Sequence, residues 1–207
     1  MMDKNEIIKD IIDIEWDMFS QVQNVGGKAS CQGRPDTFEI MRKSQMSTWS
    51  IDLLQSWFND LKDGQESGNN LMSLKYAYMM ENTHPAEFQE IKDQLPEISS
   101  DVLKMIDEIV KIHIAWKKDL NEKYPMLASR GRPISNNSDN MGWASLETYM
   151  RSELKTYSAK TISIYHKETM QRVKENKSEA AENLLNQVKE YGFSSLLEAE
   201  NKLAKKS

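Results

Sequence analysis

The sequence predicts an all-α single domain over residues 1–207, a bundle of about eight helices with one long helix in its C-terminal half. Three observations predict it. Apolar residues recur at spacings of three and four along most of the chain, which is the spacing of one helix face. Ser, Pro and Gly stand where helices begin and end. Alternating β-branched runs joined by Asn-Gly or Asp-Gly turns do not occur in the sequence.

In the N-terminal half, helix starts and stops follow from capping residues. Pro35 stands at a first helical position, where its missing N–H costs nothing. Ser50 can cap the next helix, and Gly68 ends it. Pro85 divides the following two helices, and the second of them closes before Pro96. The expected helices lie at about 4–23, 35–48, 50–66, 70–82 and 85–94.

In the C-terminal half, Ser99 or Ser100 caps a helix that Pro125 ends. Residues 125–144 are rich in Ser, Asn, Gly and Pro, so we expect an irregular segment that acts as a lid if a cavity lies beneath it. Ser145 opens the longest expected helix, about 45 Å at 1.5 Å per residue. The expected helices lie at about 100–124, 145–176, 178–191 and from Ser195 to near the C-terminus.

Composition is that of a globular protein. The chain is 39% hydrophobic and 29% charged, and its formal net charge of −5 argues against a general attraction to nucleic acid or an anionic membrane. No apolar run approaches the roughly 20 residues that span a bilayer, and the N-terminus lacks the features of a secretory signal. A single cysteine excludes an intrachain disulfide. We therefore expect a cytoplasmic protein with neither a membrane nor a nucleic-acid partner.

Five polar side chains fall inside the apolar faces of their predicted helices and are therefore expected to face a common interior: Glu15, Arg42, Gln45, His113 and Glu153. The helix at 50–66 has no such intruder. An unpaired ion in a dry core would cost several kcal/mol, so these groups pair with one another, bind a ligand or line a water-filled cavity. The Arg42 guanidinium suits one or both carboxylates.

Two interpretations follow. The cluster is either an internal ion pair that fixes helix packing or a ligand-binding or catalytic pocket. In a pocket, Glu15 and Glu153 are the candidate acid and base, His113 is a further catalytic candidate, and Arg42 anchors a small anionic ligand. The side chains expected to orient that ligand are Gln45, Tyr149 and Tyr157.

Two narrower chemistries concern a metal and the single cysteine. Two glutamates and a histidine are metal-ligand types, but the Glu-x-x-His spacing of di-iron bundles occurs only as Glu81–His84, where Pro85 and the helix end spoil it. We therefore expect no dedicated metal site, and the sequence does not identify a cofactor. A metal-dependent oxidase of unusual ligand spacing is the third interpretation. Cys31 precedes a predicted helix, where His113 could activate its thiol, although free cysteines are more often inert. Arg130 and Arg132 either receive an anion or are solvated.

The chain resembles a bacterial family of all-helical domains of unknown function, DUF4125. The resemblance covers nearly the whole chain and rests on these segments: residues 14–19, Gly26-Gly27, 29–32, 38–42, Ser44-Gln45, 75–77, Met79-Met80, Leu95-Pro96, Tyr124-Pro125, 147–149, Glu153-Leu154 and 156–158. It implies a fold and no mechanism. The leading expectation is a small-molecule-binding protein or enzyme; the alternative is a non-catalytic interaction or regulatory module, and a homodimer is open in either case.

Overall fold

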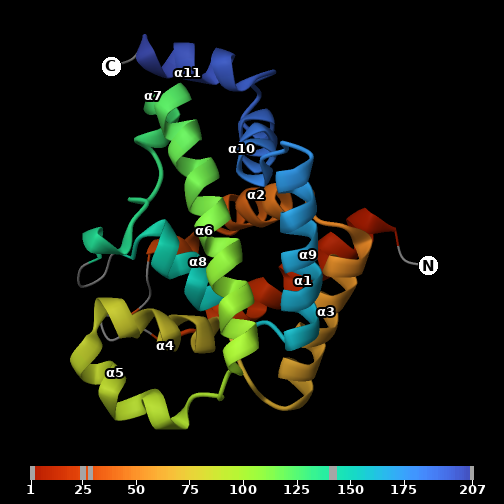
Figure 1. Cartoon of the computed structure of the whole chain (residues 1–207). Coiled ribbons are helices and arrows are strands. Elements are labelled where there is room, and N and C mark those ends of the chain that lie inside the picture. The colour runs from red at the N-terminus through yellow and green to blue at the C-terminus, as the bar shows by residue number, and fades with distance from the viewer. Residues whose placement is uncertain (1–2, 24–26, 28–29, 140–143, 206–207) are drawn as a thin grey trace.

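The computed structural model describes residues 3–23, 27, 30–139 and 144–205. Within these residues the chain is all-α, with short 3₁₀ turns and no strand, which confirms the predicted fold class. Figure 1 shows the helices, which are α1 (Lys4–Ser20), α2 (Pro35–Met46), α3 (Ile51–Glu66), α4 (Leu71–Thr83), α5 (Pro85–Ile91), α6 (Ser100–Lys123), α7 (Pro125–Ala128), α8 (Leu146–Leu154), α9 (Ala159–Lys174), α10 (Glu179–Glu190) and α11 (Leu196–Ala204). None of the helices in the described ranges is long and apolar enough to cross a membrane.

Short polar side chains start most of the helices. The side-chain oxygen of each capping residue accepts a backbone N–H from the first turn, which satisfies a donor that the helix itself cannot. The capping residues are Asp3, Ser50, Asn70, Ser99, Ser145, Ser158, Ser178 and Ser195. Helices α2, α5 and α7 instead begin with proline. After α3, Gly68 has a φ of 73°, the left-handed conformation in which glycine ends helices at little cost.

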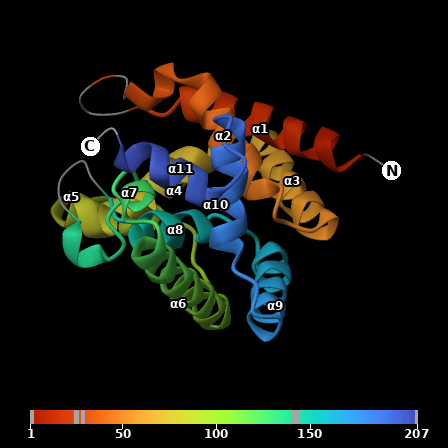
Figure 2. The ribbon, with the colours of Figure 1, turned by 90° about the horizontal axis from the view of Figure 1, so that it is seen from above.

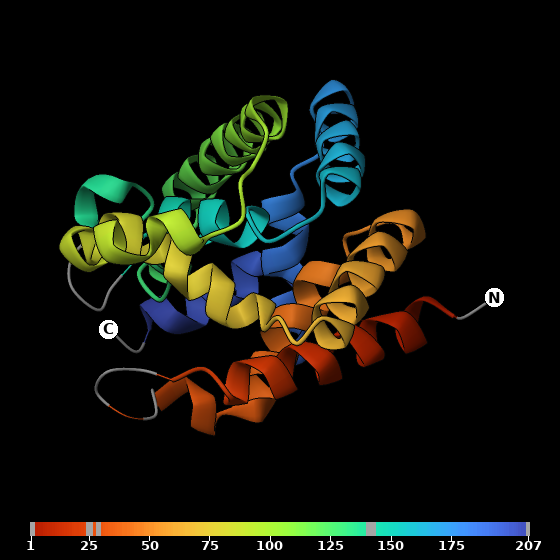
Figure 3. The same cartoon turned by 90° about the horizontal axis from the view of Figure 1, so that it is seen from below.

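The helices form two outer groups with others between them. Seen from above, α1 and α2 lie at one edge and α6 and α9 at the opposite edge, with α4, α8 and α10 between them (Figure 2). The view from below shows the same order (Figure 3). Helix α10 packs on both α2 and α6 and so joins the two edges directly, whereas α8 packs on α6 and on α4, which in turn packs on α1. The apolar core includes Ile11, Leu53, Trp57 and Ile106, all fully buried.

The predicted helix over 145–176 is wrong as one element, because it breaks between α8 and α9. The Ser158 side chain accepts the Thr161 N–H and starts a new helix. The Asp60 carboxylate accepts hydrogen bonds from the Ser158 N–H and the Thr161 hydroxyl, which fixes the break against α3. The longest helix is therefore α6, with 24 residues.

The segment predicted as irregular is partly ordered. It contains α7 and a 3₁₀ turn, Asn136–Ser138, while residues 140–143 lie outside the described part of the chain. Asp139 accepts hydrogen bonds from the Ser145 N–H and the Thr148 hydroxyl. The carbonyl of Pro133 accepts the Leu146 N–H at 2.8 Å. These contacts tie the described ends of the segment to the N-terminus of α8; the lid remains an expectation.

Candidate functional site

Four buried ions from four helices form one connected network beneath the surface. Its members are Glu15 of α1, Arg42 of α2, Lys75 of α4 and Glu153 of α8, none more than 6% exposed. Glu15 and Glu153 are 138 positions apart in the sequence, yet they bind the same guanidinium. We call these four residues the ion network. It lies where α1, α2, α4 and α8 approach one another.

Arg42 binds Glu15 with two parallel hydrogen bonds. Its Nε donates to Glu15 Oε2 at 2.6 Å, and its Nη2 donates to Glu15 Oε1 at 2.5 Å. The indole N–H of Trp57 donates to the same Oε1 at 2.8 Å. Such fork-to-fork pairing fixes the relative orientation of the two groups, because both planes must align.

Glu153 joins the second cation to the network. Its Oε1 accepts hydrogen bonds from Arg42 Nη1 at 2.9 Å and from the Tyr157 hydroxyl at 3.1 Å. Its Oε2 accepts one from Lys75 Nζ at 2.6 Å. Gln45 completes the arrangement, since its Oε1 accepts a hydrogen bond from Arg42 Nη1 at 2.9 Å.

The ion network contains two acidic and two basic side chains, and neighbouring charges set the pKa directions of Glu153, Arg42 and Lys75. Burial alone would raise the pKa of Glu153, but Arg42 and Lys75 outweigh it and hold that pKa well below its usual range. Burial would lower the pKa of Arg42 and of Lys75, yet the adjoining carboxylates raise both. Burial and the Glu153 carboxylate raise the pKa of Tyr157 well above its usual value. Glu153, Arg42 and Lys75 therefore stay charged, and Tyr157 stays neutral.

Tyr149, predicted to orient a ligand, lies between two cations. Lys75 Nζ is 3.6 Å from the centre of its ring, and the Arg132 guanidinium carbon is 4.8 Å from it. Arg132 also donates a hydrogen bond from Nη1 to the Ala144 carbonyl at 2.9 Å. The neighbouring Tyr76 is largely buried, and this burial together with Tyr149 raises the pKa of Tyr76 to about 12. Arg132 thus has partners within the protein, whereas Arg130 is exposed.

The structure corrects the placement of His113, which does not share the interior of the other four predicted residues. Its Nε2 is 3.6 Å from Glu179 Oε2 and 3.3 Å from the Tyr165 hydroxyl. Glu179 Oε1 accepts hydrogen bonds from Tyr165 at 3.0 Å and from the Trp49 indole at 3.1 Å. Burial lowers the pKa of His113, and Glu179 only partly offsets this. This second buried cluster arises because α6 packs on both α9 and α10.

Cys31 lies on the surface, in the 3₁₀ turn Ser30–Gly33 that precedes α2. No contact joins its thiol to His113 among the residues that the structure describes, so the predicted thiol–imidazole pair is not assembled. Residues 24–26 and 28–29 of the same predicted loop lie outside the described ranges. The described residues also hold no group of three or more His, Cys, Asp and Glu arranged around a common metal position.

Sequence reasoning missed Lys75, Trp57 and Glu179. A signal existed for the first, because Lys75 lies between Met72 and Met79 at spacings of three and four on one face of α4. The indole N–H of a fully buried tryptophan needs an acceptor, which was a signal for Trp57. Glu179 is the first residue of α10, and acidic residues are common in the first turn because the helix dipole favours them there. Its position therefore gave no signal that it would be buried against His113 and Tyr165.

The ion network is separate from two surface grooves of the protein. One groove lies between α6 and α8, and the other lies between α3 and α9. None of the four network residues lines either groove. Because all four are buried, the network is enclosed by protein side chains, among them Trp57 and Tyr157.

Comparison with known proteins adds a family and no activity. A family model described as "Protein of unknown function (DUF4125)" matches residues 5–201. Comparison with curated proteins and with solved structures gave no match. The family match includes all four residues of the ion network as well as His113 and Glu179. Because it extends over nearly the whole sequence, the chain belongs to the DUF4125 family.

Proposed function

We propose that the protein is a non-catalytic helical interaction or regulatory module, in which the ion network holds the helices in a defined arrangement. One observation carries this proposal: each carboxylate of the network accepts three hydrogen bonds from neighbouring side chains, and the two carboxylates are matched by two cations. A network that satisfies itself in this way has no need of a ligand.

The protonation states support the same proposal. A general base works best with a pKa near the working pH and within hydrogen-bond reach of the substrate. Arg42 and Lys75 hold the pKa of Glu153 far below that range, while Glu15 is fully buried against Arg42 and Trp57. A carboxylate held as firmly in one charge state as Glu153 is suited to positioning helices rather than to transferring protons.

The network's structural effect follows from its geometry. Arg42 on α2 binds one carboxylate from α1 and another from α8, and Lys75 then ties α8 to α4. Removing one member of such a buried set leaves an uncompensated charge, which typically costs about 3–5 kcal/mol. The arrangement of α8 against the N-terminal helices therefore depends on a complete set of partners.

Urea unfolding of Glu15→Gln and Arg42→Met tests this role. Each variant should lose about 3–5 kcal/mol of unfolding free energy or fail to fold. Lys43→Met is the matched control, because Lys43 neighbours Arg42 but forms an exposed pair with Glu190, and it should lose no more than about 1 kcal/mol.

A pocket would give a different pattern. Glu15→Gln and Arg42→Met would then keep wild-type stability and abolish a thermal shift produced by inorganic phosphate or succinate. That result contradicts the proposal. The interaction role is tested separately, by light scattering coupled to size exclusion and by pull-down from the native cell extract. A protein that is monomeric at every concentration and captures no partner contradicts that part of it.

A further inference from the structure

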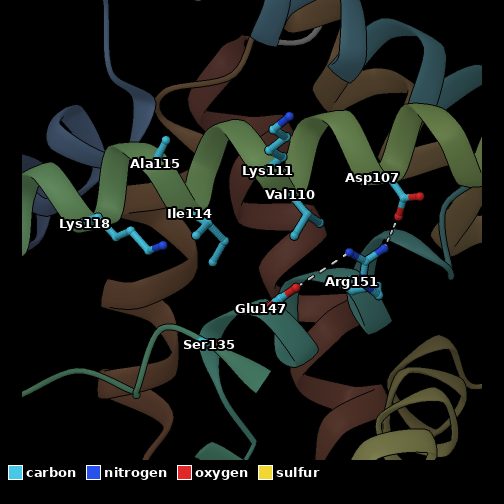
Figure 4. A pocket seen from close by; sticks show the side chains of 9 residues that line it. All are labelled: Asp107, Val110, Lys111, Ile114, Ala115, Lys118, Ser135, Glu147 and Arg151. Carbon is cyan, nitrogen blue, oxygen red and sulfur yellow. Dashed lines mark hydrogen bonds and ion pairs between the residues drawn. The ribbon is translucent and has the colours of Figure 1, made fainter. Parts of the chain in front are cut away.

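A groove runs along α6 where it meets α8 (Figure 4). Its volume is about 420 Å³, within the range of small-molecule sites. Helix α6 contributes most of its lining, and Ser135, Glu147 and Arg151 close the other side. The groove contains none of the four network ions, so an inference about it goes beyond the proposed function.

The middle of the groove is apolar. Val110 and Ile114 lie one helical turn apart on α6 and point toward α8, whereas Ala115 lies at the rim, on the same face of α6 as Lys111 (Figure 4). Val110 is fully buried, whereas Ile114 is partly exposed. This strip suits the hydrocarbon or aromatic body of a ligand.

One positive side chain in the groove is already neutralised. Arg151 pairs with Asp107, and its Nη2 lies 3.9 Å from Glu147 Oε1. Figure 4 shows the three side chains together at one end of the strip. Glu147 also accepts the Asn136 N–H at 3.2 Å. This end is therefore occupied by internal contacts.

Two lysines at the groove have no such partner. Neither Lys111 nor Lys118 makes an ion pair or a side-chain hydrogen bond within the described ranges, and both are exposed. They are seven residues apart, which is two turns or about 10.5 Å along α6. In Figure 4 the Lys118 side chain extends along the groove toward Ile114, while Lys111 points outward from the rim. Three cations and two carboxylates line the groove, a local positive excess on a chain with a net charge of −5.

The groove between α3 and α9 provides a comparison. It is larger, about 640 Å³, and also has two lysines seven residues apart, Lys160 and Lys167. There, however, Asp52 and Glu168 line the same groove and balance the two cations. A positive excess therefore distinguishes the α6–α8 groove.

We propose that the α6–α8 groove binds a small organic anion, with its apolar body on Val110 and Ile114, beside the rim residue Ala115, and its anionic group at Lys118. Lys111 adds a longer-range attraction at the rim. The chemistry is that of a carboxylate, sulfonate or phosphate attached to an apolar group. Binding adds the partner that Lys118 lacks and covers the exposed part of the apolar strip.

The test uses 8-anilinonaphthalene-1-sulfonate as the probe and uncharged N-phenyl-1-naphthylamine as its control. The intact chain should bind one sulfonate probe saturably, and binding should weaken as NaCl is raised from 50 to 500 mM. Lys118→Gln should weaken that binding about fivefold to tenfold, and Lys111→Gln should weaken it about twofold. Neither substitution should alter binding of the uncharged compound. Ala115→Trp, at an exposed position of α6, should block both compounds.

The matched control is the double variant Lys160→Gln/Lys167→Gln, which removes the same charges with the same spacing from the other groove. It should leave the affinity of the sulfonate probe within about twofold of wild type. The inference is overturned if this control weakens binding as much as Lys118→Gln does, if the uncharged compound binds as tightly, or if binding does not saturate. Poly-glutamate serves as a second probe, which represents an acidic polypeptide. The inference is also overturned if poly-glutamate binds at Lys118 and the sulfonate probe does not, because the occupant is then an acidic chain and not a small anion. Circular dichroism of every variant separates these outcomes from unfolding, which is the readout for the ion network.

Discussion

Arg42 binds Glu15 through two hydrogen bonds, with Arg42 Nε 2.6 Å from Glu15 Oε2 and Arg42 Nη2 2.5 Å from Glu15 Oε1. The same guanidinium reaches Glu153 through Nη1, so one side chain of α2 orients both α1 and α8. Lys75 supplies the second positive charge that keeps the set neutral. The unfolding free energy should therefore depend more on charge balance within the ion network than on any single contact.

The first prediction concerns acid. Burial alone would raise the folded-state pKa of Glu153, but Arg42 and Lys75 outweigh burial and lower that pKa below its usual value. The carboxylate thus contributes stability that is complete above about pH 4.5 and is lost as the pH falls below it. In the charge-balanced variant Lys75→Met/Glu153→Gln, the unfolding free energy measured in urea from pH 5 to 2.5 should fall less steeply, by up to about 1.4 kcal/mol per pH unit.

An exposed pair supplies the control for that slope. Asp119→Asn/Lys123→Gln removes an ion pair between two exposed side chains one turn apart on α6. Its acid profile should follow the wild type, because exposed pairs contribute at most about 1 kcal/mol. A Lys75→Met/Glu153→Gln profile as steep as the wild type would contradict the account of Glu153.

A second prediction concerns His113 at milder acidity. Burial lowers its pKa, and Arg172 also lowers it, while Glu179 raises it in part. A histidine that the fold keeps neutral contributes stability that is complete above about pH 6.5 and is lost as the unfolded chain begins to take up the proton. The unfolding free energy should therefore fall between pH 7 and 5, and His113→Gln should flatten that fall.

His166 pairs with Glu108 outside this cluster, so His166→Gln is the comparison variant at a second histidine. A wild-type protein with constant unfolding free energy over this interval would refute the prediction for His113. Direct titration of the His113 ring by NMR should place its midpoint below that of a free histidine.

A third prediction concerns Lys117, a partly buried cation of α6. Burial lowers its pKa, and no carboxylate pairs with it among the described residues. Replacing it by methionine keeps the length of the apolar stem and removes the charge that must be desolvated. Lys117→Met should raise the unfolding free energy at pH 7 by less than about 1 kcal/mol. Lys118→Met, at the exposed neighbouring position, should change it by no more than about 0.5 kcal/mol. A net loss of stability in Lys117→Met would be the contrary result.

The sequence allowed the fold class and much of the ion network to be predicted. Local signals are strong for helices, because caps such as Ser50 and prolines such as Pro35 act on their own first turn. The inward positions of Glu15, Arg42 and Glu153 follow from helix periodicity, and opposite charges in one core must pair. These inferences need no knowledge of the tertiary arrangement.

Other features depend on long-range contacts that local patterns do not encode. The break between α8 and α9 depends on Asp60 of α3, which is 98 residues before Ser158. His113 lies on an apolar stripe like the network residues, but that stripe faces Glu179 and Tyr165 instead. Helical periodicity tells which side of a helix is buried, and it does not tell which neighbour buries it.

The most direct measurement of the central claim is a double-mutant cycle of Glu15→Gln and Arg42→Met by urea unfolding at pH 7. Each single variant leaves one unbalanced charge in the core, whereas the double variant leaves Glu153 balanced by Lys75. The double variant should therefore lose less stability than the two single losses combined, by about 2–3 kcal/mol. Losses that add within about 0.5 kcal/mol would contradict a structural network governed by charge balance.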